Sequence, residues 1–257
     1  MKKVLITLLA VVLLVSSSAA AVSAAPSSNA GKPAAEIDKI VFVHYPKVNA
    51  QGSEPYWSPP NAPAPTDENT RYKYTNFRWA VPEVEYEVNP SGAGAPDGAE
   101  NGIKAAFDTW EAASGVMDFE CLSESSSETS LDDSQPDGTN VVSWEDITAK
   151  HPGAIAVAIV WYYTGSKEII EVDTMMNSTL QWSLNDGFMG DPNIDLGDTE
   201  AYDVQNIMTH EAGHWLMLED LYQWKTQKLT MYGYGAKGEL QKRTLGEGDE
   251  LGIEGIY

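Results

Sequence analysis

Cysteine is almost absent from this sequence, because Cys121 is the only one among 257 residues. An intrachain disulfide is therefore excluded, and the stability of the fold has to come from an apolar core and from any bound metal. Cys121 follows Phe119 in the stretch DFECLSES, a context that favours a buried structural thiol over a reactive one.

Basic side chains are also scarce. Lys and Arg together number 16 against 38 Asp and Glu, which gives a net charge of −22, and only Arg71, Arg78 and Arg243 are arginines. A surface of this sign repels phosphate groups, so nucleic acid is excluded as a partner. Such a charge favours solubility, and we expect a monomer.

Long hydrophobic runs are missing except near the N-terminus. The run from Val4 to Val15 follows two lysines, spans about 12 residues and precedes a stretch of small residues. It is shorter than the roughly 20 residues that a membrane-spanning helix needs. We interpret residues 1–25 as a secretory signal peptide, cut after Ala24 or Ala25, rather than as an uncleaved anchor. The prediction is a secreted, extracellular protein without stable membrane insertion after cleavage.

Residues 26–70 are rich in Ala, Pro, Ser and Asn, a composition typical of a pro-region or a flexible linker. Within them, only KIVFVHYP at Lys39–Pro46 has the composition of a strand. Regular hydrophobic patterns begin after this segment, so we assign residues 71–257 to the folded domain.

The pattern over residues 71–257 predicts an α+β fold. Alternation of apolar residues with glutamate predicts a half-buried strand over residues 82–90, and helical spacing predicts a helix over residues 96–115. The apolar run at residues 153–163, the turn TGSK and the run at residues 168–177 predict a β-hairpin.

The stretch MTHEAGH indicates a metal site. A helix that begins with Asp203 as its N-cap would place His210 and His214 one turn apart on the same face. Glu211 would reach a metal-bound water rather than the metal itself, which is the pattern of zinc peptidases. Two of the four histidines of the chain stand here, which argues against ordinary surface positions.

A third ligand has to come from the residues after the helix. Asp220 stands six residues after His214, and a carboxylate oxygen is a suitable zinc ligand. The helix must end first, because a continuing helix would rotate residue 220 away from the histidines. Glu219 is the competing candidate and would suit a different turn.

At this point the chain resembles a known family. HEAGHWLMLED is similar to the extended motif of metzincin metallopeptidases, His-Glu-x-x-His-x-x-Gly-x-x-His or Asp. The four chemical positions of that motif fall on His210, Glu211, His214 and Asp220. Met217 stands where the family has glycine.

The stretch LTMYGYG, in which Tyr232 follows Met231, resembles the methionine turn of the matrixin branch, the matrix-metalloproteinase-like peptidases. The resemblance covers residues 72–257. It implies a zincin-like catalytic domain with a twisted mixed sheet, an edge strand over the cleft, three main helices and a Met-turn in which Met231 lies beneath the metal. The thiol-switch motif of the family is absent, since no cysteine precedes the domain.

The resemblance implies a secreted zinc-dependent endopeptidase in which Glu211 is the general base and a catalytic Zn²⁺ is the cofactor. It also implies that a protein or peptide substrate binds antiparallel to the edge strand within Ala154–Tyr163, and that Tyr232, Gly233 and Tyr234 shape the substrate pocket. The alternative is a non-catalytic exported module that binds zinc or a partner through a degenerate peptidase fold.

Two further patterns leave alternatives open. The stretch DPNID at residues 191–195, together with Asp198, offers oxygen ligands for a structural Ca²⁺, although an ordinary acidic loop explains it at least as well. The sequon at Asn177 carries either a glycan or a bare surface asparagine.

Overall fold

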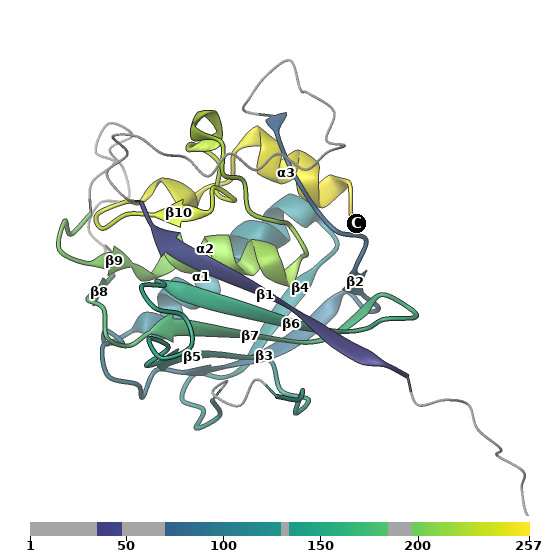
Figure 1. Ribbon diagram of the computed structural model, residues 1–257, viewed down its shortest axis with the longest axis horizontal. Coiled ribbons are helices and arrows are strands. Elements are labelled where there is room, and N and C mark those ends of the chain that lie inside the picture. The colour runs from purple at the N-terminus through teal and green to yellow at the C-terminus, as the bar shows by residue number, and fades with distance from the viewer. Residues whose placement is uncertain (1–34, 48–69, 130–133, 185–196) are drawn as a thin grey trace, which may run out of the picture. The chain divides into compact units, whose positions relative to one another are not determined.

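A mixed β-sheet with helices on one face forms the framework of the protein (Figure 1). The computed structural model describes residues 35–47, 70–129, 134–184 and 197–257. The strands are β1 (Ile37–Pro46), β2 (Arg78–Trp79), β3 (Glu83–Asn89), β4 (Asp118–Ser123), β5 (Val141–Glu145), β6 (Ala156–Tyr163), β7 (Glu168–Asn177), β8 (Trp182–Ser183), β9 (Tyr202–Asp203) and β10 (Tyr234–Gly235). The α-helices are α1 (Ala99–Ser114), α2 (Val204–Trp215) and α3 (Glu247–Glu254), and short 3₁₀ turns cover Trp224–Thr226 and Gln241–Arg243.

The main sheet has the order β10-β1-β6-β7-β5-β3-β4, and β2 pairs with β7. β6 is antiparallel to both of its neighbours, whereas the pairs among β7, β5, β3 and β4 are parallel. The predicted hairpin is confirmed as β6 and β7. The α+β class is also confirmed, with a mixed sheet and three α-helices.

β6 is an interior strand of the sheet, flanked by β1 and β7, which corrects the expectation that residues 154–163 form an edge strand. Eight residue pairs join β1 to β6 in antiparallel register, from Ile37 opposite Tyr163 to His44 opposite Ala156. Seven of the eight residues of β6 are buried, as their continuous apolar run favours. The sequence pattern could not show this pairing, because β1 and β6 are more than 100 residues apart in the chain.

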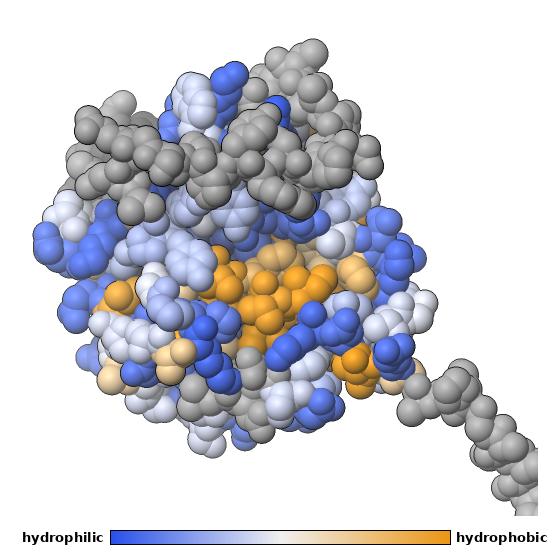
Figure 2. Space-filling model, in the orientation of Figure 1, coloured by the Kyte–Doolittle hydropathy of each residue, from blue (hydrophilic) through white to orange (hydrophobic). Residues whose placement is uncertain are grey.

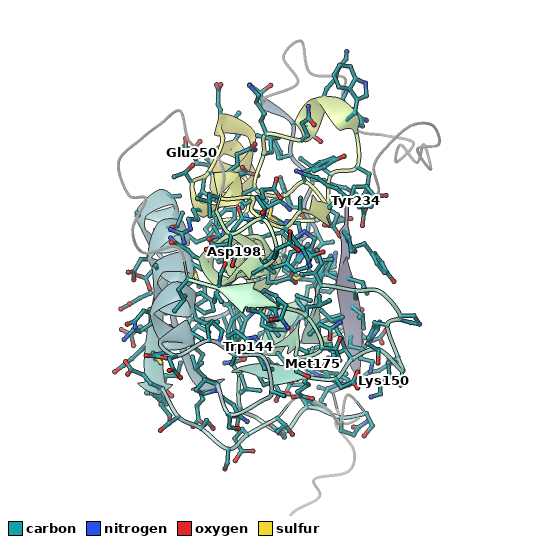
Figure 3. The ribbon with its side chains drawn as sticks, turned by 90° about the vertical axis from the view of Figure 1, so that its left-hand side faces the viewer. Trp144, Lys150, Met175, Asp198, Tyr234 and Glu250 are labelled. Carbon is teal, nitrogen blue, oxygen red and sulfur yellow. The ribbon has the colours of Figure 1, made fainter. Side chains whose placement is uncertain are left out.

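The strand predicted at Lys39–Pro46 is confirmed as β1, and it belongs to the main sheet. Figure 3 shows α1 on one side of α2 and β1 on the other. The division of the chain near residue 70 and the role of residues 26–70 as a pro-region stay predictions. The signal segment at residues 1–25 and the acidic stretch at residues 191–195 lie outside the described residues.

The core lies between the sheet and the two longer helices. α1 buries Ile103, Phe107 and Trp110 and ends at Gly115, whose φ of 65° is the left-handed conformation that glycine adopts readily. The Trp110 indole nitrogen donates to the carbonyl of Thr209 at 2.7 Å, which joins α1 to α2. The predicted helix is confirmed, and its aromatic residues serve packing.

α2 begins where the sequence predicts it. The Asp203 carboxylate accepts from the backbone N–H of Asn206 at 2.8 Å, the pattern of an N-cap. Arg243 donates to the same carboxylate through Nε at 2.7 Å and Nη2 at 2.6 Å. This bidentate pair ties the start of α2 to the segment before α3.

The structure agrees with the prediction for Cys121 and excludes a surface position for Asn177. Cys121 is partly buried and its thiol lies 3.5 Å from the carbonyl oxygen of Ser123, consistent with a structural role. Asn177 is not a surface residue, because it is 1% exposed and its amide nitrogen donates to the carbonyl of Ala154 at 2.7 Å. A glycan on the folded chain at Asn177 is therefore excluded. Within the described ranges, no helix is long and apolar enough to cross a lipid bilayer.

A buried carboxyl group in β7 makes stability depend on pH. Burial, reinforced by the charge of Glu171, raises the pKa of Asp173 to about 8. In the unfolded chain the same group ionises near pH 4, so the folded state loses stability as the pH rises from about 4 to 8.

We expect Asp173→Asn to be more stable than the unsubstituted protein at pH 8, by at least about 1 kcal/mol, and equally stable at pH 4. The Asn side chain can still accept the hydrogen bond from the backbone N–H of Val141. Urea unfolding at pH 4, 6 and 8 measures the difference, and a difference that does not change with pH would contradict the assignment.

Candidate metal centre

The two histidines of α2 have fixed ring orientations. His210 Nδ1 lies 2.7 Å from the carbonyl oxygen of Thr230, and His214 Nδ1 lies 2.7 Å from that of Leu218. A carbonyl oxygen only accepts, so each Nδ1 carries the proton and donates it. Each Nε2 therefore presents a lone pair, the form that binds metals.

Asp220 completes a cluster of three acceptors. Its Oδ1 lies 3.1 Å from His210 Nε2 and 3.7 Å from His214 Nε2. Both His210 Nε2 and Asp220 Oδ1 are buried without a hydrogen-bond partner among the described residues. Tyr222 fixes the carboxylate by donating to Oδ2 at 2.9 Å. Buried acceptors that face one another repel unless a cation lies between them, so these three residues could hold a metal ion.

The protonation states of the three side chains also suit metal binding. Burial is the main cause that lowers the pKa of His210 to about 3, and burial also lowers the pKa of His214. Burial by itself would raise the pKa of Asp220, but its interactions with the two histidines and Tyr222 outweigh burial and lower it to about 2. At neutral pH the cluster therefore consists of two neutral imidazoles and one carboxylate, which is a suitable ligand set for a divalent cation.

The turn that brings Asp220 to the histidines occurs at Met217 without a glycine. Met217 has a φ of 67°, in the left-handed region, and its side chain is fully buried. The backbone N–H of Leu218 donates to the carbonyl of Gly213 at 2.9 Å, which closes the end of α2. This conformation costs a non-glycine residue about 1–2 kcal/mol, and burial of the thioether side chain offsets that strain.

Glu219 points to a different partner. Its carboxylate forms an ion pair with Lys73, and its backbone N–H donates to the carbonyl of the same residue at 2.7 Å. Of the two acids proposed as third ligand, Asp220 lies with the histidines and Glu219 does not.

Met231 packs closely against α2 at Gly213. A Cβ atom added to Gly213 would lie 2.3 Å from Met231 Sδ, so only glycine allows the sulfur to approach at this point. The carboxylate of Asp249, in α3, accepts from the backbone N–H groups of Thr230 and Met231 at 2.8 and 3.0 Å. α3 thereby fixes the turn whose Thr230 carbonyl orients His210.

Glu211 is enclosed beside the histidines. It is 0% exposed, and burial raises its pKa well above the ordinary value. Its Oε2 has no hydrogen-bond partner among the described residues, whereas its Oε1 lies 3.0 Å from His44 Nδ1.

Sequence analysis missed His44 and Lys242. His44 comes from β1 and, with His210 and Glu211, forms a second group of side chains that could hold a metal. Lys242 is fully buried, with Nζ 3.0 Å from His44 Nε2 and donating to the carbonyl of Tyr232. Burial is the main cause that lowers its pKa to about 8. His44 could have been noticed as a rare histidine within the one strand candidate of residues 26–70. No sequence pattern marks Lys242 as part of the site.

The residues proposed for the substrate pocket lie beside β1. Tyr234 pairs with Tyr45 in parallel register, and Figure 3 shows Tyr234 near the upper end of β1. Tyr232 is buried, and Gly233 lets the chain pass close to the Tyr222 ring, because an added Cβ would lie 2.4 Å from it. Their role in substrate binding stays a prediction.

A cavity of about 350 Å³ lies between β1 and the segment that carries Asp220 and Tyr222. Asp220 and Tyr222 line it from the metal cluster, and Lys73 and Glu219 line it from the neighbouring ion pair. The remaining lining residues come from β1: Val41, Phe42, Val43 and Tyr45.

No protein-family model and no curated protein matches this chain.

The turn at Met217 gives a direct test with a matched pair of variants. In ordinary helix or strand conformation, Ala is more stable than Gly by about 1 kcal/mol. At a φ of 67° this order should reverse, so we expect Met217→Gly to be about 1 kcal/mol more stable than Met217→Ala. Both variants lose the same buried side chain, and urea unfolding compares them.

Ala212→Gly, inside α2, serves as the control and should show the ordinary order, with Gly less stable than Ala. A Met217→Ala protein as stable as Met217→Gly would show that the turn is not left-handed in solution.

Proposed function

We propose that this chain is a zinc-dependent endopeptidase of the metzincin type, in the matrixin branch. The observation that carries the proposal is the convergence of His210 Nε2, His214 Nε2 and Asp220 Oδ1, with Glu211 next to them. Ligand atoms around a tetrahedral zinc ion lie about 3.3–3.6 Å apart, and the two separations from Asp220 are 3.1 and 3.7 Å. The residues present therefore fit zinc.

The surrounding fold supports the same proposal. The candidate third ligand follows a left-handed turn at Met217, and Met231 packs against Gly213 between the two histidines of α2 in sequence, which supports a Met-turn. The mixed sheet and the three α-helices agree with the class that the resemblance implies. Secretion is proposed from the N-terminal segment alone.

The chemistry follows from the ligand set. Zinc, when bound, polarises a substrate carbonyl and lowers the pKa of a bound water towards neutrality. Glu211 Oε2 accepts a proton from the attacking water and transfers it to the leaving amine, and the raised pKa of this buried carboxyl suits both steps. The Thr230 and Leu218 carbonyls hold the imidazoles in the ligating tautomer.

Glu211→Ala tests the reaction. We expect it to abolish hydrolysis of denatured casein, by a factor of at least about 10² for loss of a general base, while zinc content stays at one ion per chain. Because His44 hydrogen-bonds Glu211, the substitution is made both in the unsubstituted chain and in His44→Ala. Equal activity with and without Glu211, in whichever of the two backgrounds cleaves casein, would exclude the mechanism.

A second experiment compares Asp220→Ala with Glu219→Ala. Asp220→Ala should lower zinc affinity by about tenfold or more, because it removes one of three ligands, whereas Glu219→Ala should leave it unchanged. Zinc titration against a chromogenic chelator measures both proteins. The reverse result would make Glu219 the ligand.

The alternative function, a non-catalytic exported module that binds zinc or a partner, rests on the missing glycine at Met217. It predicts no casein cleavage in the unsubstituted chain or in His44→Ala, whether or not zinc is bound. The left-handed turn at Met217 brings Asp220 to the histidines, so the geometry favours the peptidase.

A further inference from the structure

β1 lies along the strand to which an extended peptide substrate would add. It pairs with β6 in antiparallel register over eight residues and with β10 in parallel register over two. Addition of an extended peptide to a sheet edge is a common mode of peptide recognition. The antiparallel direction is the one that sequence analysis expects for a substrate along residues 154–163.

Two side chains of β1 cover the metal cluster. The Phe42 ring stacks on His214 with centroids 4.0 Å apart and an angle of 4° between the planes, and the His44 ring lies 3.9 Å from that of His210. Phe42 and His44 are two residues apart, so both point to the same face of the strand. β1 therefore lies directly over both imidazoles.

His44 is held at both ring nitrogens. Lys242 Nζ has no acceptor lone pair when charged, so it donates to His44 Nε2 at 3.0 Å. The proton of His44 is then on Nδ1, which donates to Glu211 Oε1 at 3.0 Å. All three side chains are at most 1% exposed, so this chain of hydrogen bonds forms in a buried environment, where such networks are strong.

The opposite face of β1 is also apolar. Val43 packs against the cluster that contains Val157 and Ile159 of β6, and Val41, which pairs with Ile159, is exposed. Figure 2 shows apolar side chains gathered in the middle of the face on which β1 and β6 lie in Figure 1. The edge of β6 is thus filled by an extended segment that is apolar on both faces, and this edge is the substrate groove of the proposed peptidase.

We propose that residues 37–46 form an internal inhibitory strand, which occupies the substrate groove in the direction of a substrate and is latched by the hydrogen bond from His44 to Glu211. The proposal rests on the proposed peptidase function. In this state the general base is engaged and the pairing edge of β6 is taken, so a protein substrate binds only after β1 leaves the groove. A thiol from the segment before the domain cannot take the place of this latch, since the one cysteine of the chain is Cys121.

The first experiment locks the strand. Val41 lies directly opposite Ile159, and cross-strand partners are within the range of a disulfide. We expect the full chain carrying Val41→Cys and Ile159→Cys to bind no substrate when oxidised, and to recover at least tenfold in casein cleavage when a phosphine reductant opens the bond. The reduced protein has the same substitutions and is the matched control.

The second experiment measures binding without catalysis. The probe is a fluorescein-labelled peptide with the sequence of residues 37–46, IDKIVFVHYP, and anisotropy is read with a chelator present so that the probe stays intact. The strand within the chain competes at a high effective concentration, so the unsubstituted protein should bind the probe poorly. His44→Ala should bind it about tenfold more tightly, the effect of losing one hydrogen bond to a charged group. His151→Ala replaces a histidine outside the site and should behave as the unsubstituted chain.

The outcomes separate the two proposals. Cleavage or probe binding by the oxidised, locked protein at the rate of the reduced one would overturn the inhibitory strand, as would His44→Ala binding no better than His151→Ala. If His44→Ala binds the probe and zinc but no variant hydrolyses casein, the strand occupies the groove as proposed and the peptidase function fails instead. Thermal unfolding confirms that each variant is folded before it is scored.

Discussion

The left-handed turn at Met217 is the constraint on which the metal cluster depends. α2 presents two imidazoles, and Asp220, the candidate third ligand, reaches them only because the chain reverses within the few residues after His214. A buried Met side chain holds a conformation that usually requires glycine, so core packing and ligand geometry are coupled at one residue. Any change that relaxes this turn moves Asp220 away from the histidines.

The rest of the site is built from backbone groups that distant segments supply. The carbonyl of Thr230 orients His210, and the carboxylate of Asp249 in α3 holds the Thr230 backbone in turn. The bidentate pair between Arg243 and Asp203 fixes the start of α2 on the same side of the molecule. The geometry of the cluster is therefore a property of the whole C-terminal half of the chain.

β1 adds a second set of hydrogen bonds to the site, through His44. A histidine, a lysine and a glutamate form a buried hydrogen-bonded chain across three segments, and each of the three would be costly to bury alone. Glu211 serves the proposed chemistry through Oε2, while Oε1 serves the contact with His44. One carboxylate thus links the proposed catalysis to the proposed latency.

The sequence by itself determined the α+β class, α1, the β6–β7 hairpin, the N-cap at Asp203 and the candidates at the metal cluster, because each of these rests on spacing within a short window. The tertiary structure brought Asp220 rather than Glu219 beside the histidines, buried Asn177, and placed His44 and Lys242 next to Glu211. Those outcomes depend on contacts between residues far apart in sequence, such as β1 with β6, and no local period or propensity encodes such contacts.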